Sequence, residues 1–127
     1  MLNFEYENPT KVIFGSNALG KMGEEVIRFG QKVLLVYGGS SLKTTGNYEK
    51  ISNALKAAKV EWIDFGGNVK PEISAVAKAV TICKEQNVDA VIGIGGGCCM
   101  DLAKAIGRCA KYDKSVLAKC FHKTILH

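Results

Sequence analysis

The sequence predicts an α/β fold in which helices cover both faces of an open, mostly parallel sheet. Strand-like and helix-like segments alternate along the chain, which is typical of a parallel sheet with right-handed crossovers. Two strand candidates, Lys32–Tyr37 and Ala90–Ile94, are apolar at consecutive positions, as expected for strands buried on both faces. Glycines follow directly after both of these strands, so each strand has a clear end.

The composition indicates a globular protein of one domain. The chain has 127 residues, 47% of them apolar, and a chain this long can bury about two thirds of its unfolded surface. The 17 basic residues are scattered singly rather than clustered, so we expect small phosphate-bearing ligands and no nucleic acid. No apolar run approaches the roughly 20 residues of a membrane span, so we expect no membrane insertion.

Cysteine usage and the start of the chain predict a cytoplasmic location. The segment from Met1 to Glu7 is acidic, unlike the basic leader of an exported protein. The cysteines are odd in number and contain no C-x-x-C pair, so neither a disulfide framework nor a zinc site is expected. They are Cys83, Cys98, Cys99, Cys109 and Cys120.

The amino-terminal segments predict an edge hairpin followed by a helix. Strand candidates Leu2–Tyr6 and Lys11–Gly15 are divided by a turn of sequence Glu-Asn-Pro-Thr. A helix should then begin at the N-cap residues Ser16 and Asn17 and end at Gly30. Its buried face would carry Leu19, Met22, Val26 and Phe29.

The middle of the chain predicts a strand, a loop, a helix and a second strand. Lys32–Tyr37 should be a central strand that stops at a glycine and serine loop, residues 38–41. Asn47 can cap the next helix, and Val60–Phe65 should form the following strand, which ends at glycines 66 and 67. The buried face of this helix would carry Tyr48, Ile51, Leu55 and Ala58.

The last predicted elements are a helix, a strand and a helix. Pro71 favours a helix start, and apolar spacing continues to about Asn87. Ala90–Ile94 should be a buried strand that leads through three glycines into a helix over Cys98–Ala110. The inward residues of the two helices would be Ile73, Val76, Ala77, Val80 and Cys83, then Leu102, Ala103, Ile106 and Ala110.

The final stretch differs from the rest of the chain. We expect an α/β domain over residues 1–112 and an irregular tail over residues 113–127, where the periodicity weakens and no closing element is visible. The chain therefore looks cut short. The histidines, His122 and His127, both lie in this tail at i, i+5 spacing, so we expect solvated residues and no metal ligands.

Glycine clusters at two strand ends predict a phosphate-binding site. Ligands of open α/β sheets lie outside the carboxyl ends of the strands, where Gly38 and Gly39 follow one strand and Gly95, Gly96 and Gly97 follow another. Backbone N–H groups can approach a pyrophosphate closely where side chains are absent, and the following helix adds free donors and its dipole. The alternative is a plain strand-to-helix turn that requires positive φ.

The first cluster continues into hydroxyl-bearing residues that could bind the adenosine end of a dinucleotide. Ser40 and Ser41 offer donors, and the loop contains no acidic residue to accept from a ribose 2′-OH and repel a 2′-phosphate. This favours NADP over NAD, with Lys43 as a counter-charge. An ordinary glycine and serine loop remains the alternative.

Two residues of the last helix are further candidates. Gly93, Gly95 and Cys98 give only G-x-G-x-x-C, so the usual Rossmann fingerprint is not satisfied. Asp101 could orient the loop or contact the nucleotide, and it could equally complement the helix dipole. Adjacent thiols at positions 98 and 99 also leave redox sensing open as a minor alternative.

The segment Gly95–Ile106 closely resembles the signature G-G-G-S-x-x-D-x-A-K of iron-containing alcohol dehydrogenases, especially the butanol dehydrogenase branch. Three other segments are similar to that family's opening, nucleotide-ribose loop and following loop. They are Phe4–Gly15, Tyr37–Ser40 and Gly67–Pro71. The resemblance covers residues 1 to about 112 and implies a Rossmann-like, NAD(P)-binding amino-terminal half.

The resemblance also implies an activity. Family members interconvert alcohols with aldehydes or ketones by hydride transfer from NAD(P)H or to oxidised NAD(P), and a second, helical domain supplies an aspartate and histidines that bind iron or zinc. No segment of this chain matches that domain, so we assign no catalytic residue and no metal ligand, and expect the chain alone to be inactive. The family is often dimeric, and a homodimer stays one alternative.

Two positions depart from the family pattern. Cys98 stands where the family has serine, which exchanges a strong donor for a weak one and could weaken cofactor binding by about 1 kcal/mol. Glu72 stands where relatives often have asparagine, and its carboxylate would have to turn away from a phosphate. The alternative function is a stand-alone nucleotide-binding module without catalysis, which the glycine clusters alone would equally support.

Overall fold

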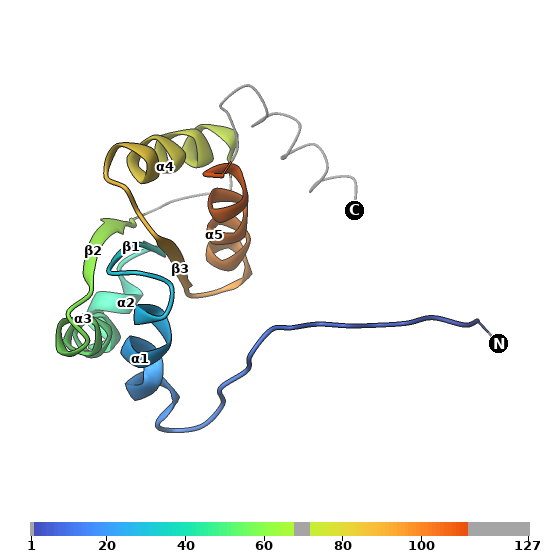
Figure 1. The fold of residues 1–127 in the computed structure, drawn as a ribbon. Helices are drawn as coiled ribbons and strands as arrows, with labels where there is room; N and C mark the ends of the chain where they lie inside the picture. The colour runs from blue at the N-terminus through green and yellow to red at the C-terminus, as the bar shows by residue number, and fades with distance from the viewer. Residues whose placement is uncertain (1, 68–71, 112–127) are drawn as a thin grey trace.

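A computed structural model of the protein describes residues 2–67 and 72–111. Its three strands form one parallel sheet in the order β2-β1-β3, with β1 at Lys32–Tyr37, β2 at Glu61–Phe65 and β3 at Ala90–Ile94. The helices are η1 (Ala18–Lys21, a 3-10 helix), α1 (Met22–Ile27), α2 (Ser41–Thr44), α3 (Asn47–Ala57), α4 (Ile73–Glu85) and α5 (Gly97–Cys109). Helices α4 and α5 cover one face of the sheet and α1 to α3 the other (Figure 1). The predicted open parallel sheet with helices on both faces is confirmed.

Strand β1 is the centre of the fold. Side chains alternate across a strand, so Leu34 and Val36 point toward α4 and α5, whereas Val33 and Leu35 point toward α2 and α3. All four side chains are at most 1% exposed. This double burial explains why the strand is apolar at consecutive positions rather than at alternate ones.

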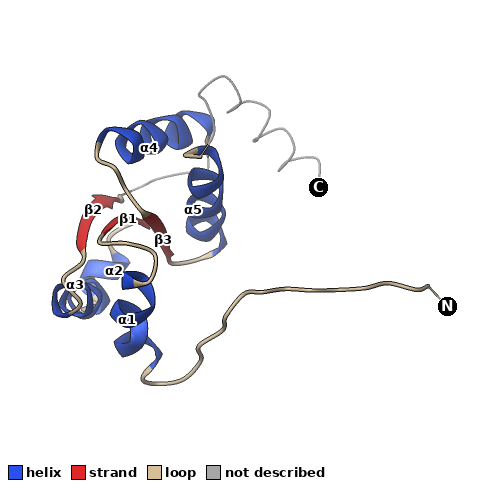
Figure 2. Cartoon of the chain, viewed as in Figure 1, coloured by secondary structure: helices blue, strands red, loops and turns tan. Residues whose placement is uncertain are grey.

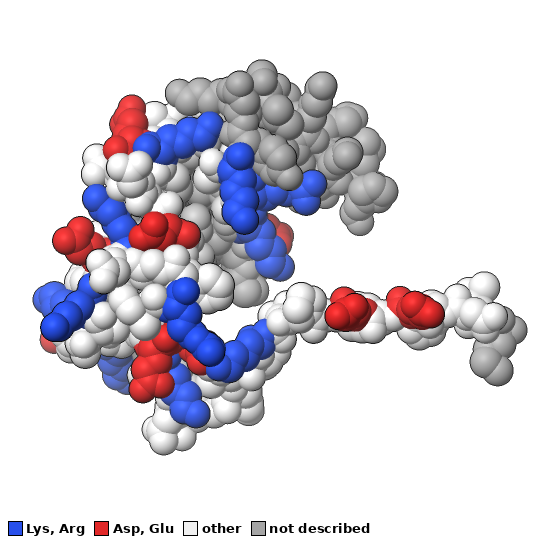
Figure 3. Space-filling model, viewed as in Figure 1, with Lys and Arg blue, Asp and Glu red and all other residues white. Residues whose placement is uncertain are grey.

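Charged residues surround this core without forming a stripe on the face shown in Figure 3. Basic and acidic side chains are interspersed over the helices there. Among residues 2–67 and 72–111, no helix has the length and apolar character needed to cross a lipid bilayer. Cys83, Cys98 and Cys99 are free thiols.

The predicted amino-terminal edge hairpin is wrong. Residues 2–14 form no strand, and they run away from the body of the molecule as an extended segment (Figures 1 and 2). Phe4 is 85% exposed and Phe14 is 99% exposed. A two-stranded hairpin is marginal in water unless other strands or a helix cover its apolar face, and none of the described elements does so here.

The first helix also differs from its prediction. It starts as the 3-10 turn η1, and neither Ser16 nor Asn17 makes a side-chain capping bond. Helix α1 ends at Ile27, so Phe29 falls beyond the helix and is 72% exposed instead of buried. At Gly30, φ is +150° and an added Cβ would lie 2.2 Å from the Cβ of Asp89, so both the backbone conformation and this close approach require glycine there.

Several boundaries shift slightly from their predicted places. Helix α3 starts at Asn47 itself, after Gly46 as the N-cap with φ of +77°. Ser41 begins the short helix α2 where a loop was predicted. The predicted helix start at Pro71 and the predicted tail, residues 113–127, lie outside the described residues.

Acidification is expected to release the base of the amino-terminal segment from α1. Lys11 pairs with one carboxylate oxygen of Glu25, and the Arg28 guanidinium lies 3.2 Å from the other. The hydrogen bond from Lys11 is the main reason that the pKa of Glu25 lies below its ordinary value of 4.5. A depressed folded pKa means that the stabilisation is present above pH 4.5 and is lost as the pH falls through the folded value.

An NMR titration of the Glu25 side chain measures its pKa and so tests this prediction. In the Lys11→Gln variant, the pKa of Glu25 should rise toward 4.5 because its largest favourable partner is gone. An unchanged Glu25 pKa in this variant would show that the Lys11 contact does not form in solution.

Candidate functional site

The carboxyl edge of the sheet brings the two predicted glycine clusters together. Tyr37 is the register partner of Ile94 in the parallel pair β1–β3, so Gly38 and Gly95 leave the sheet at the same edge. The buried side chain of Cys99 lies between them. A Cβ built on Gly38 would lie 3.1 Å from the Cys99 sulfur, and one built on Gly95 would lie 3.3 Å from it.

Cys99 is a site-shaping residue that sequence reasoning missed. Its side chain is 9% exposed and contacts both glycine turns, so it fixes the start of α5 against the ends of β1 and β3. The signal was present in the sequence: positions 99, 102, 103 and 106 share one helical face, and all four are buried. The resemblance to the family signature points instead to Cys98, which stands where the family has serine.

Gly96 and Gly97 have no such internal reason to be glycine. Gly96 is the N-cap of α5 in extended geometry, φ −75° and ψ −176°, which any residue can adopt, and Gly97 is the first helical residue. A Cβ at either position would meet no heavy atom of the described residues within 4 Å. Their missing side chains therefore leave open space at the amino-terminal end of α5.

This open space is lined by backbone donors. The Gly96 carbonyl accepts from the N–H groups of Cys99 and Met100 at 3.1 and 3.2 Å. The N–H groups of Gly97 and Cys98 lie in the first turn of the helix, so no carbonyl of the same helix is placed to accept a hydrogen bond from them. They lie at the positive end of the dipole of a helix of 13 residues. A phosphate or pyrophosphate fits such a cradle, which an added Cβ would fill.

The serines of the first cluster are placed at the same edge of the sheet. Ser40 is the N-cap of α2 but makes no side-chain capping bond, and its carbonyl accepts from the N–H of Lys43 at 3.1 Å. The hydroxyls of Ser40 and Ser41 make no hydrogen bond to any described residue, and both residues are exposed. They are free to bind a ligand.

The two remaining candidates, Cys98 and Asp101, are exposed on α5. Cys98 is the second helical residue and adjoins the open space at Gly97. Asp101 lies beyond the first helical turn and makes no hydrogen bond or ion pair within the described part of the chain. Its contact with the nucleotide and its role toward the dipole therefore both stay predictions.

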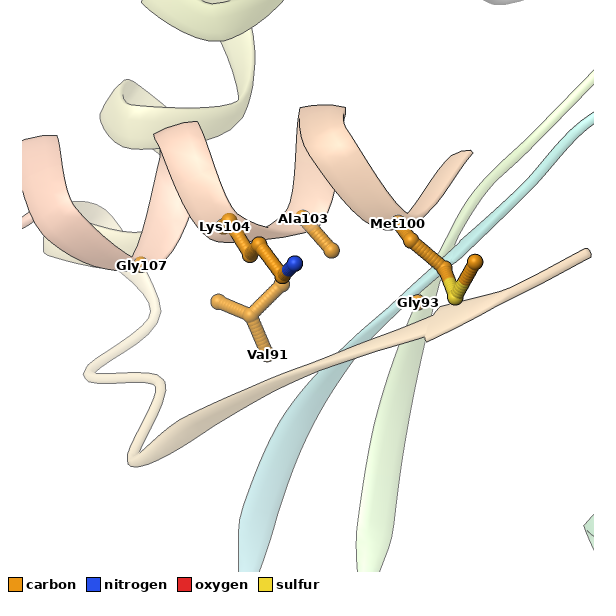
Figure 4. Close-up of a pocket in the computed structure, with 6 residues that line it drawn as sticks. All are labelled: Val91, Gly93, Met100, Ala103, Lys104 and Gly107. Atoms are coloured by element: carbon orange, nitrogen blue, oxygen red, sulfur yellow. The ribbon is translucent and has the colours of Figure 1, made fainter. Parts of the chain in front are cut away.

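A separate cavity lies between α5 and the edge strand β3. It has a volume of about 390 Å³ and a mostly apolar lining (Figure 4). The lining residues are Val91, Gly93, Met100, Ala103, Lys104 and Gly107. Lys104 is the one titratable side chain in this set, so the cavity does not provide an acid and base pair.

Residues 2–67 and 72–111 contain no group of three His, Cys, Asp or Glu side chains placed to hold a metal ion. The two histidines of the chain lie outside the described residues. The site as described thus consists of backbone donors, two hydroxyls and open space at the edge of the sheet. These are groups that bind a phosphate-bearing ligand, and they include no evident group for acid or base chemistry.

Comparison with known proteins places this arrangement in a family. The sequence matches the iron-containing alcohol dehydrogenase family over residues 9–125. It is 45% identical to the probable NADH-dependent butanol dehydrogenase 1 of Bacillus subtilis over 89% of this chain and 30% of the relative. It is 34% identical to an NADPH-dependent aldehyde reductase of Escherichia coli over 91% of this chain and 30% of the relative.

A solved structure shares the fold. The crystal structure of NADH-dependent butanol dehydrogenase A from Thermotoga maritima aligns with a TM-score of 0.83 and 42% identity. The alignment covers 90% of this chain and 29% of that chain. The chain thus spans slightly less than a third of the length of these relatives, and the part that it matches is their amino-terminal region. On this sequence match and this shared fold, the chain belongs to the iron-containing alcohol dehydrogenase family.

Proposed function

We propose that this chain forms the dinucleotide-binding part of an iron-dependent alcohol dehydrogenase that interconverts alcohols with aldehydes or ketones. The observation that carries the proposal is the open space at Gly96 and Gly97, which no side chain of residues 2–67 and 72–111 fills. The dinucleotide, when bound, supplies or accepts the hydride. The proposed cofactor-binding residues are Gly38, Gly39, Ser40, Ser41, Gly95, Gly96, Gly97, Cys98 and Asp101.

Each part of the site has a proposed task. The free N–H groups of Gly97 and Cys98 bind the pyrophosphate, and the α5 dipole favours its negative charge. Cys99 packs against both glycine turns and fixes the distance between them. The subsites for the pyrophosphate and for the adenosine end are therefore already formed at the edge of the sheet before the dinucleotide binds. The hydroxyls of Ser40 and Ser41 donate to the adenosine ribose or to a phosphate on it.

The proposed division of labour leaves the metal and the alcohol outside the described residues. Iron or zinc is proposed to lie in a further domain of the longer protein, where it polarises the substrate oxygen. Hydride transfer needs the alcohol held against the nicotinamide, so this chain alone should not turn over an alcohol. Alcohol-dependent reduction of NAD(P) by the purified 127-residue chain would contradict this division.

The proposed cofactor preference is NADP over NAD. The loop formed by residues 38–41 contains no carboxylate to repel a 2′-phosphate. The relatives include proteins named for NADH and for NADPH. Calorimetric titration of NADPH and NADH against this chain tests the proposal. Tighter binding of NADH would contradict the preference, and no heat of binding for either dinucleotide would contradict the site.

Assembly and location are proposed on separate grounds. Exposed apolar side chains in residues 2–14, Phe4 and Phe14 among them, favour a homodimer in which a second copy covers them. The free thiols of Cys83, Cys98 and Cys99 suit a reducing cytoplasm.

Cys98 is expected to report cofactor binding by its rate of alkylation. It is exposed, whereas Cys83, Cys99 and Cys109 are buried, and burial also raises the pKa of the Cys83 thiol. A small alkylating reagent should therefore modify Cys98 faster than these three, and saturating NADPH should slow that reaction because the pyrophosphate covers the start of α5. Mass spectrometry of the peptides over a time course measures the rates.

The buried cysteines serve as the internal control for the Cys98 experiment. Protection confined to Cys98 supports a ligand at the start of α5, whereas equal slowing at Cys83 would indicate general stabilisation of the fold. An unchanged Cys98 rate at saturating NADPH would place the cofactor elsewhere.

A further inference from the structure

We propose that Tyr37 is a positioning residue of the dinucleotide site, and that its ring fixes the turn after β2 against the loop after β1. The inference rests on the proposed function, and it adds a residue that acts on the cofactor through the backbone of these two segments. It arises from a buried ring that leaves the neighbouring Gly66 no room for a side chain.

The Tyr37 ring lies against the turn that follows β2. Val36 is the register partner of Phe65, and the next two residues, Tyr37 and Gly66, leave the sheet at the same edge. A Cβ built on Gly66 would lie 2.2 Å from Cε2 and 2.4 Å from Cζ of the Tyr37 ring. The φ of Gly66 lies outside the positive region, so the ring and not the backbone conformation requires glycine there.

The Tyr37 ring has little freedom to move away from this turn. Tyr37 is 5% exposed, and its ring contacts the Tyr48 ring edge to face, with centroids 5.8 Å apart. The Tyr48 hydroxyl in turn donates to Asp64 Oδ2 at 2.7 Å and accepts from Trp62 Nε1 at 3.4 Å. Both of these partners belong to β2, so the ring is held by contacts with α3 and with the end of β2.

The loop after β1 packs on the same ring. Leu42 in α2 is 9% exposed and belongs to the same buried cluster as Tyr37. The Lys43 ammonium lies 5.9 Å from the centroid of the Tyr37 ring, close enough to be attracted by the ring quadrupole. Tyr37 therefore joins the segments that follow β1 and β2, much as Cys99 joins those at β1 and β3.

The hydroxyl of Tyr37 takes no part in this packing. It makes no hydrogen bond to any described residue. No buried side-chain nitrogen or oxygen of residues 2–67 and 72–111 lacks a partner, so this oxygen reaches the surface. The ring, and not the hydroxyl, should therefore carry the positioning role.

Replacement of Tyr37 tests the inference by calorimetric titration of NADPH and of NADH. Tyr37→Leu removes the ring and should weaken both dinucleotides about tenfold, because the two segments would then have to be ordered on binding. Tyr37→Phe keeps the ring and should retain both affinities within about twofold, since the hydroxyl has no hydrogen bond to lose.

Val33 offers a matched control for the loss of buried apolar volume. It is fully buried in the same cluster and on the same face of β1 as Tyr37, but about 13 Å away along the strand. Val33→Ala should therefore lower the urea midpoint and leave the affinity for both dinucleotides unchanged. The comparison separates positioning of the site from general destabilisation of the core.

Gly66→Ala tests the same contact from the side of the turn. The added methyl group would displace the ring, so the urea midpoint and both affinities should fall. Tyr37→Leu removes the clashing ring atoms, so the double variant should be as stable as Tyr37→Leu alone. Its affinity should nevertheless stay low, because the ring is absent. A merely structural role of the ring would instead make the affinity follow the stability.

Three results overturn the inference in distinguishable ways. If both cofactors bind and Tyr37→Leu changes their affinities no more than Val33→Ala does, the ring does not position the site and the proposed function stands. Equal losses in Tyr37→Phe and Tyr37→Leu would assign the role to the hydroxyl instead of the ring. If neither cofactor binds the wild-type chain, the proposed function fails and the inference fails with it.

Discussion

Gly97→Ala should weaken NADPH binding by about tenfold or more while leaving the protein as stable as before or slightly more so. The two effects separate because the added methyl group would meet no atom of the described part of the chain within 4 Å but would enter the space proposed for the pyrophosphate. Alanine is also the better helix former at this first position of α5. Calorimetry measures the binding, and urea denaturation measures the free energy of unfolding.

Gly107→Ala is the control for this experiment. It adds the same methyl group to the same helix but near the other end of α5, again with no atom of residues 2–67 and 72–111 within 4 Å. It should raise stability by up to about 1 kcal/mol and leave NADPH binding unchanged. Undiminished NADPH affinity in Gly97→Ala would show that the pyrophosphate lies elsewhere.

Gly93→Ala should destabilise the fold by about 1–3 kcal/mol. Helix α5 passes so close to β3 that a Cβ on Gly93 would lie 2.7 Å from the Cβ of Ala103 and 3.1 Å from the carbonyl oxygen of Cys99. The backbone of α5 cannot rotate away from this contact as a flexible side chain could, so the helix has to shift as a body. The urea midpoint of the variant measures the effect.

A second substitution tests the cause of the Gly93→Ala effect. Ala103→Gly removes the nearest clashing methyl group, so the double variant should be more stable than the sum of the two single changes predicts. Additive effects would mean that the contact with Ala103 is not the source of the loss. An unaltered urea midpoint in Gly93→Ala would contradict the close approach itself.

The regular elements of this protein could be predicted because each has a local signature. The uninterrupted apolar run of β1 reflects burial by helices on both sides, and the apolar spacing of α5 reflects one face against the sheet. The amino-terminal hairpin could not be predicted in the same way. Alternating apolar residues show that a segment is able to form a strand, but they do not show whether anything is present to cover it.

The location of the candidate site was predicted from the sequence, but the side-chain contacts that shape it were not. Its glycines and serines were correctly placed at one edge of the sheet because the carboxyl ends of parallel strands lie together. Cys99 was missed as the contact between the two glycine turns. The contact between the rings of Tyr37 and Tyr48, over which the Lys43 ammonium lies, was also missed. It joins the end of β1 to α3, and these two segments share no sequence motif.

The sequence by itself determined the order of strands and helices, the positions of the glycine clusters and the family signature, since these depend on local periodicity and residue identity. The tertiary structure alone decided which glycines serve the protein's own packing and which leave space for a ligand. Gly38 and Gly93 are glycine because neighbouring elements approach them closely, Gly95 because its φ is +130°, and Gly96 and Gly97 face space that no described residue fills. Such a distinction depends on distances between elements that are remote in sequence, which no local pattern contains.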